Sequence, residues 1–178
     1  MGFLSLLRPS KKVPITWWSS DNPLNVKPKF STLLIIIAGE WIFGTGDAVL
    51  ITAGIGNTPW TVLAEGLSDV IGRSIGQATF IVSVCVLFLW IPLREKIGLG
   101  TILNVIFIAL AIEIMVPILP TPESYWLAVL QVAIGVLLVG IGSTLYLTAN
   151  LGPGPRDGLM TGLQRVSGRP IGKVRNHN

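Results

Sequence analysis

The chain has 178 residues, of which 51% are hydrophobic and only 12% are charged, and its net charge is +4. Soluble globular domains carry about 25% charged residues, so this composition excludes an ordinary water-exposed surface and indicates an integral membrane protein. The positive charge does not indicate a nucleic-acid partner, because the lysines and arginines flank the apolar segments, as they do in membrane proteins.

Residues 1–29 form a basic segment ahead of the first apolar stretch, and they include Arg8, Lys11, Lys12, Lys27 and Lys29. Basic residues beside a membrane span favour the cytoplasmic side. We therefore expect a multi-pass protein of the bacterial inner membrane whose N-terminus is cytoplasmic.

The first apolar stretch, residues 30–53, is long enough to span a bilayer and contains two acidic residues. Glu40 and Asp47 lie seven residues apart, about two helical turns, and so share one face of a helix. Ionisable groups at this depth are costly and usually face protein, a cavity or a partner. Together with Glu113, they predict a polar path for protons or cations. The alternative is that protonated carboxyls hydrogen-bond between helices.

Residues 58–71 predict a short amphipathic helix, with Thr58 as its N-cap and Pro59 in its first turn. The thirteen residues from Pro59 to Ile71 reach about 20 Å, which is too short to cross a bilayer. We expect this helix to lie in the interface or to enter the membrane as a re-entrant segment.

Three further apolar stretches, residues 74–93, 99–119 and 124–149, bring the expected number of spans to four. With the N-terminus inside, this topology places every lysine and arginine except Arg73 on the cytoplasmic side. The charge distribution therefore supports the helix count and the orientation together.

A second amphipathic helix is expected at residues 157–167, after a loop rich in glycine and proline. Arg156 and Asp157 of this region form a candidate site for an anionic head group or a partner protein. The simpler interpretation is that glycine and proline end one helix here and that another begins near Asp157.

Sliding the sequence against itself by 96 residues aligns residues 39–78 with residues 135–174 without a gap, and fifteen of the forty positions are identical. The matches include glycines and prolines that chance pairing of apolar residues would not align, so we infer a duplication. The first unit, residues 30–119, holds three expected spans. Because three is an odd number, the second unit, residues 124–178, enters the membrane from the opposite side. The sequence thus predicts an all-α membrane bundle with an inverted repeat.

The second unit is expected to be incomplete. Counterparts of residues 76–119 would begin at Gly172, whereas the sequence continues there with a short polar stretch. We therefore expect a C-terminally truncated product that lacks two closing helices.

The segment Asn150-Leu151-Gly152-Pro153-Gly154-Pro155-Arg156-Asp157-Gly158-Leu159-Met160, followed by Gly168-Arg169-Pro170-Ile171-Gly172, resembles the signature region of the YczE-like membrane proteins. This group includes the YyaS and YitT proteins. The earlier stretch Gly98-Leu99-Gly100-Thr101-Ile102-Leu103-Asn104 is similar to the same family. The resemblance implies a polytopic inner-membrane protein, some of whose relatives are linked to the production of secreted metabolites. It implies no catalytic residues.

These observations leave two principal hypotheses for function. The first is a transporter-like protein for a small solute or secreted metabolite. The second is a membrane scaffold or regulatory partner of a biosynthetic or export system, and an inactive truncated fragment is a further alternative. We expect no enzymatic activity, cofactor or metal site, because the sequence has one histidine, His177, and one cysteine, Cys85. Beyond the lipid bilayer, the expected partners are a second copy of the chain or another membrane protein, and not nucleic acid.

Overall fold

The computed structural model describes residues 14–167, which fold into six α-helices. In chain order these are α1 (Phe30–Ala53), α2 (Pro59–Ile71), α3 (Ile75–Leu93), α4 (Leu99–Met115), α5 (Tyr125–Ala149) and α6 (Pro155–Ser167). The described chain is therefore all-helical, as its composition predicts. Residues 1–13 of the basic segment and residues 168–178, with the motif Gly168 to Gly172, lie outside the described residues.

Three of these helices, α1, α3 and α5, are long and apolar enough to cross a membrane. The fourth expected span, residues 99–119, is shorter than predicted, because α4 ends at Met115 and has 17 residues. Pro117 accounts for the early end, because it lacks the backbone N–H that would continue the helical hydrogen bonds, although Val116 before it still has helical geometry (φ −55°, ψ −46°). At about 26 Å, α4 lies at the lower limit of spanning length.

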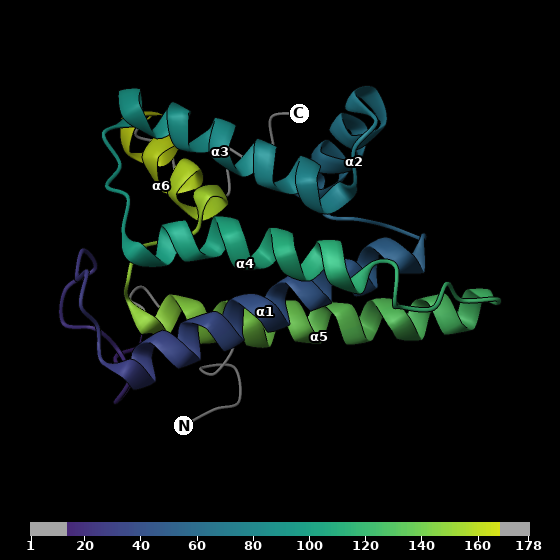
Figure 1. Cartoon of the computed structure of the whole chain (residues 1–178), viewed down its shortest axis with the longest axis horizontal. Coiled ribbons are helices and arrows are strands. Elements are labelled where there is room, and N and C mark those ends of the chain that lie inside the picture. The colour runs from purple at the N-terminus through teal and green to yellow at the C-terminus, as the bar shows by residue number, and fades with distance from the viewer. Residues whose placement is uncertain (1–13, 168–178) are drawn as a thin grey trace.

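The helices pack around α4 and α1 (Figure 1). α1 lies along both α5 and α4, while α3 packs against the other side of α4 and also contacts α6 and α2. The polypeptide thus forms two groups, α1 with α5 and α3 with α2 and α6, and α4 lies between them.

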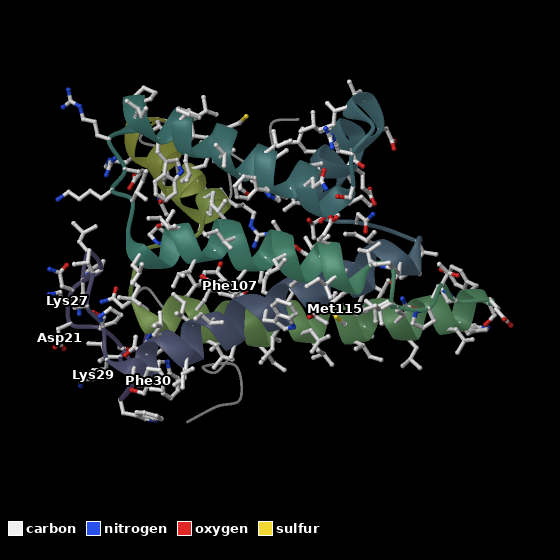
Figure 2. The ribbon with its side chains drawn as sticks, viewed as in Figure 1. Asp21, Lys27, Lys29, Phe30, Phe107 and Met115 are labelled. Carbon is white, nitrogen blue, oxygen red and sulfur yellow. The ribbon has the colours of Figure 1, made fainter. Side chains whose placement is uncertain are left out.

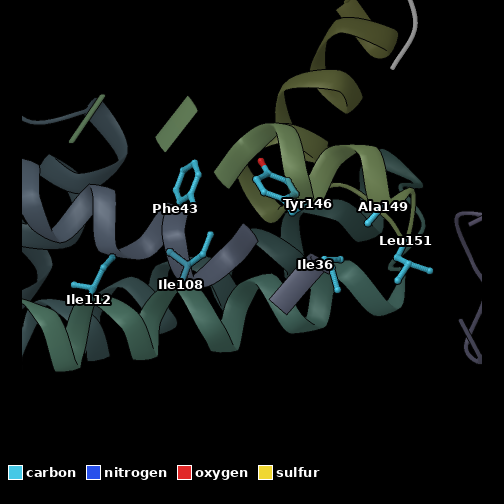
Figure 3. Close-up of a cluster of buried hydrophobic side chains, with 7 residues drawn as sticks. All are labelled: Ile36, Phe43, Ile108, Ile112, Tyr146, Ala149 and Leu151. Carbon is cyan, nitrogen blue, oxygen red and sulfur yellow. The ribbon is translucent and has the colours of Figure 1, made fainter. Parts of the chain in front are cut away.

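The hydrophobic core joins α1, α4 and α5 (Figure 3). Its buried members are Ile36, Phe43, Ile108, Ile112, Tyr146, Ala149 and Leu151. The burial of the spanning helices differs widely: the most apolar part of α1 is 56% buried, whereas that of α5 is only 17% buried. α1 is therefore the central helix, and the apolar outer face of α5 is suited to contact with lipid.

α1 and α5 approach each other closely at two pairs of glycines. A Cβ atom on Gly39 would come within 3.1 Å of the Gly142 carbonyl oxygen, and one on Gly46 within 3.0 Å of the Gly135 carbonyl oxygen. Small residues at such crossings let helix backbones pack tightly in membranes. These four glycines therefore set the distance between the two helices.

The two short helices turn small and polar residues towards the protein. In α2, Thr61, Ala64 and Ser68 are buried, while Val62 and Val70 are exposed. In α6 the buried positions include Gly158 and Gly162, and Leu163 and Val166 are exposed. This pattern is the reverse of that in a water-soluble protein, and it agrees with apolar faces directed at lipid. Thr58 caps α2 as expected, accepting a hydrogen bond from the Thr61 backbone N–H (3.2 Å).

Basic residues from distant parts of the chain gather at one end of the bundle. Figure 2 shows Lys27 and Lys29 at the end where α1 begins. At the same end, Asn22, Pro23 and Leu24 share a groove with Arg94, Lys96 and Arg165. The stretch around Ser20 is docked at this end, since Ser20 donates its backbone N–H to the Ala149 carbonyl oxygen (2.9 Å). The positive charge of the described chain is thus concentrated where α3 and α5 end and where α1 and α4 begin.

Candidate functional site

The two glycine-rich motifs that carry the family resemblance meet at the start of α4. The Gly100 backbone N–H donates to the Leu151 carbonyl oxygen (2.7 Å), and the Thr101 hydroxyl donates to the Pro153 carbonyl oxygen (2.8 Å). A side chain on Gly98 would collide with the Leu151 carbonyl group, so the close approach requires glycine at this position. The loop between α5 and α6 is therefore held against α4 by backbone contacts.

The first turn of α6 is held against α3 by Trp90, which is fully buried. Its indole N–H donates to the Pro155 carbonyl oxygen (3.1 Å), and its ring occupies the space where a side chain on Gly158 would project. The position of α6 thus depends on a glycine beneath a tryptophan ring. This arrangement directs Arg156 and Asp157 towards the spanning helices.

Arg156 and Asp157 form an ion pair that is anchored to α1 and α5. The Arg156 Nε atom lies 3.7 Å from the Asp157 Oδ1 atom, and the Tyr146 hydroxyl donates a hydrogen bond to the other carboxylate oxygen of Asp157. The Arg156 guanidinium also lies over the Phe43 ring, 5.1 Å from its centroid, in a cation–π contact. The two residues of the predicted loop site therefore belong to a cluster that includes two spanning helices.

A small cavity lies beside this cluster, and every helix of the described chain contributes to its wall. It offers about 30 Å³ to water-sized molecules. One water needs about 10–15 Å³ by this measure, so two fit. Its lining includes Asp47 from α1, Trp60 from α2, Thr79 and Ser83 from α3, Asn104 from α4, Tyr146 from α5, and Arg156 and Asp157 from α6.

Two buried polar side chains of this lining each have one atom without a hydrogen-bond partner among the described residues. Asp47 is 3% exposed and Asn104 is 7% exposed. Within residues 14–167, no group hydrogen-bonds to the Asp47 Oδ1 atom or to the Asn104 Nδ2 atom. Buried polar atoms normally have a partner, so these two atoms mark the cavity as a site for a small polar ligand, ion or water.

The structure brings Asp47 together with Arg156 and Asp157 but places Glu40 and Glu113 elsewhere. Glu40 is fully buried, is not among the residues lining the cavity, and has no hydrogen-bond partner for either carboxylate oxygen in the described part of the chain. Glu113 accepts a hydrogen bond from the Ser74 hydroxyl (2.5 Å) beside the start of α3. One cavity therefore combines residues from the two predicted sites.

Several residues of the cavity were not predicted from the sequence. Asn104 lies within a family motif, and Thr79 and Ser83 are spaced by four residues, which places both hydroxyls on one face of α3. No local signal distinguishes Trp60 or Tyr146 from an ordinary aromatic residue of a membrane protein. In residues 14–167, the one cysteine and the acidic side chains form no group of three or more that could hold a metal ion.

The sequence of this chain is similar to three bacterial proteins. An uncharacterized protein of Haemophilus influenzae is 40% identical over 151 residues, which are 85% of this chain and 68% of that protein. The uncharacterized membrane protein YczE of Bacillus subtilis is 30% identical over 83% of this chain and 66% of its own length, and YyaS of the same organism is 26% identical over 75% and 68%.

The chain thus spans about two thirds of the length of these relatives. No solved structure matches it. Residues 30–178 match a family described as a family of unknown function, DUF6198. The chain therefore belongs to the DUF6198 family and is a membrane protein homologous to YczE and YyaS of Bacillus subtilis.

Proposed function

We propose that this protein is a transporter-like membrane protein built as an inverted repeat, and that it moves a small solute or secreted metabolite along a path beside the cavity lined by all six helices, called here the six-helix cavity. The proposal includes no catalytic step and no cofactor. It places four spans in the bacterial inner membrane, with α4 as the shortest, and puts the basic end of the bundle in the cytoplasm.

The ends of the helices support the duplication, because they repeat with the same offset of 96 residues as the sequence. α1 ends at Ala53 and α5 at Ala149, and α2 (Pro59–Ile71) has the same offset from α6 (Pro155–Ser167). Each of the two long helices is followed by a residue in the left-handed conformation, Gly54 in one unit and Asn150 in the other.

The crossing of α1 and α5 supports a two-fold relation between the units. The offset pairs Gly39 with Gly135 and Gly46 with Gly142, so exchanging the units converts the contact of Gly39 with Gly142 into that of Gly135 with Gly46. The structure contains both contacts. Because α1 and α5 run in opposite directions, this relation is the one expected of an inverted repeat (Figure 1).

The lining of the cavity is the single observation that carries the proposal. Trp60 and Arg156 are equivalent under the 96-residue offset, and both line this cavity. In secondary transporters built from inverted repeats, the substrate site lies at the interface of the two units. A polar cavity between equivalent positions of both units fits that plan better than a purely structural role.

Accessibility of the cavity from the two sides of the membrane tests the proposal without knowledge of the substrate. In a Cys85→Ser background, Ser83→Cys places one thiol in the cavity wall. A membrane-impermeant thiol reagent is applied to spheroplasts and to inverted vesicles. A transporter that alternates between two open states exposes Ser83→Cys from both sides, so labelling is expected in both preparations.

Two control variants show what labelling from one side only and no labelling look like in this assay. Asp69→Cys, on the exposed surface of α2, is expected to react from one side only, and Ile141→Cys, on the exposed apolar face of α5, from neither. If Ser83→Cys reacts from a single side, or only with a membrane-permeant reagent, the transport proposal is wrong.

The basic end of the bundle favours one alternative, a scaffold that positions a cytoplasmic partner. Arg94 and Lys96 are exposed there and share a groove with Arg165, whose charge is already paired with Glu95 (3.0 Å). A scaffold predicts one-sided labelling of Ser83→Cys and a partner that co-purifies with the protein. That partner is expected to be lost from the double variant Arg94→Gln with Lys96→Gln.

A further inference from the structure

The charges around the six-helix cavity do not balance. Asp47 and Asp157 supply two carboxylates, and Arg156 supplies one guanidinium, which is paired with Asp157 (3.7 Å). Asp47 is 3% exposed, and a buried charge without a partner is strongly unfavourable. The cavity therefore carries one negative charge that a positively charged ligand or a proton would neutralise.

We propose that the cavity binds one small monovalent metal cation, with Asp47 as its charged ligand. The inference deepens the proposed function and rests on it, since a cation bound here would be the ion whose gradient drives movement of the solute. In secondary transporters, such ions bind near the middle of the membrane, beside interrupted helices. Here the cavity lies where the chain breaks between α5 and α6.

The oxygen atoms around the cavity are suited to bind a hard cation, which prefers oxygen ligands. The Asp47 Oδ1 atom has no partner within residues 14–167, and the Thr79 hydroxyl uses its proton on the Ile75 carbonyl oxygen (2.8 Å), so its lone pairs are free to face an ion. Ser83 adds a second hydroxyl one turn further along α3.

Asn104 is the fourth proposed ligand of the cation, after Asp47, Thr79 and Ser83. Its amide oxygen and nitrogen are interchangeable by rotation of the amide group, and the nitrogen is the atom without a partner in the described chain. Rotation would turn the oxygen towards an ion. Gly154 leaves the space for this amide, because a Cβ atom there would lie 2.9 Å from the Asn104 Oδ1 atom.

Size and charge select the class of ion. A volume of about 30 Å³ admits a bare or singly hydrated cation and excludes an organic solute. The single net negative charge matches a monovalent ion, whereas divalent sites in proteins normally collect more carboxylates around the metal. The ion and the transported solute would therefore occupy neighbouring rather than identical positions.

Thermal unfolding of the purified full-length chain in detergent tests the inference, with sodium chloride as the probe and choline chloride as the control at equal ionic strength. A ligand that binds only the folded state raises the Tm in a saturable way. The Tm of the wild-type protein and of Asp69→Asn is expected to rise by several degrees with sodium. Asp47→Asn is expected to show no such rise.

If Asp47→Asn does not fold, Ser83→Ala and Asn104→Ser provide the test, because each removes a neutral ligand. The midpoint of the sodium titration is expected to move about tenfold higher in both variants. Equal Tm values in the two salts for the wild-type protein, unchanged midpoints in these variants, or stabilisation by low pH without any sodium effect would overturn the inference.

This assay separates the inference from the proposed function, since binding in detergent requires no access from two sides. A sodium effect combined with one-sided labelling of Ser83→Cys would remove transport and retain the cation site. The reverse result would remove the cation site and retain transport.

Discussion

At the residue scale, Gly44 and Gly140 are aligned by the 96-residue offset but have different surroundings. A Cβ atom on Gly44 would lie 2.7 Å from the Ala111 Cβ atom and 2.8 Å from the Ile108 carbonyl oxygen. Around Gly140, apart from the chain neighbours and the adjoining backbone of α5 itself, the described part of the chain places no atom within 4 Å of such a Cβ. The pair therefore separates the effect of helix packing from that of glycine itself.

We expect Gly44→Ala to destabilise the protein by about 1–3 kcal/mol, because the added methyl group forces α1 away from α4. Gly140→Ala should be neutral or stabilising by up to about 1 kcal/mol, since alanine favours a helix more than glycine does. Thermal unfolding in detergent measures both variants. Equal loss of stability in the two would contradict the packing seen between α1 and α4.

At the element scale, the ends of the helices were largely predictable from the sequence, because their signals are local. Proline and threonine mark the start of α2, and glycine or asparagine follows α1, α2 and α5. The end of α4 differs from the expected Leu119, because apolar residues continue past Pro117 while the helix itself ends at Met115. The proline, and not the apolar composition, therefore indicates where this helix ends.

The residue that follows α5 allows a graded test of helix termination. Asn150 is in the left-handed conformation (φ 54°), and its amide donates to the Ser20 carbonyl oxygen (2.7 Å). Asn150→Gly retains the conformation and loses this hydrogen bond, at a cost of about 0.5–1.5 kcal/mol. Asn150→Ala loses the bond and adds left-handed strain of about 1–2 kcal/mol.

Gly54, at the aligned position after α1 (φ 69°), is the matched control, because it has no side chain to lose. Gly54→Ala is expected to show the strain alone. Stability should therefore decrease from wild type to Asn150→Gly to Asn150→Ala in thermal unfolding. If Asn150→Ala is no less stable than Asn150→Gly, the left-handed conformation has no energetic role.

At the scale of the whole molecule, the all-helical class and the membrane location followed from composition, whereas the cavity did not. Asp47, Arg156 and Asp157 were identified because charges are conspicuous in apolar sequence. Asn104, Thr79 and Ser83 were missed, because small polar residues are common in membrane helices and only tertiary packing brings these three together. Glu40 and Asp47 share a helical face, yet only Asp47 lines the cavity. Of the four acidic residues predicted to form sites, Asp47 and Asp157 line it, and Glu40 and Glu113 do not.

The number of spans can be decided by the two loops that flank α4. In the Cys85→Ser background, Lys96→Cys precedes α4 and Glu123→Cys follows it, and both positions are exposed. If α4 spans the membrane, an impermeant thiol reagent labels Lys96→Cys only from the cytoplasmic side and Glu123→Cys only from the outer side. Labelling of both positions from the same side would contradict the four-span topology and the opposite directions of α1 and α5.

The paired glycine contacts between α1 and α5 also restrict how the molecule can move. Gly39 and Gly46 are seven residues apart, so the two points of contact are separated by about 10 Å along the helix. Two helices fixed at two separate points cannot pivot on each other without breaking one of them. We therefore expect α1 and α5 to move as one unit, so that any opening of the molecule moves α2, α3 and α6 relative to this pair.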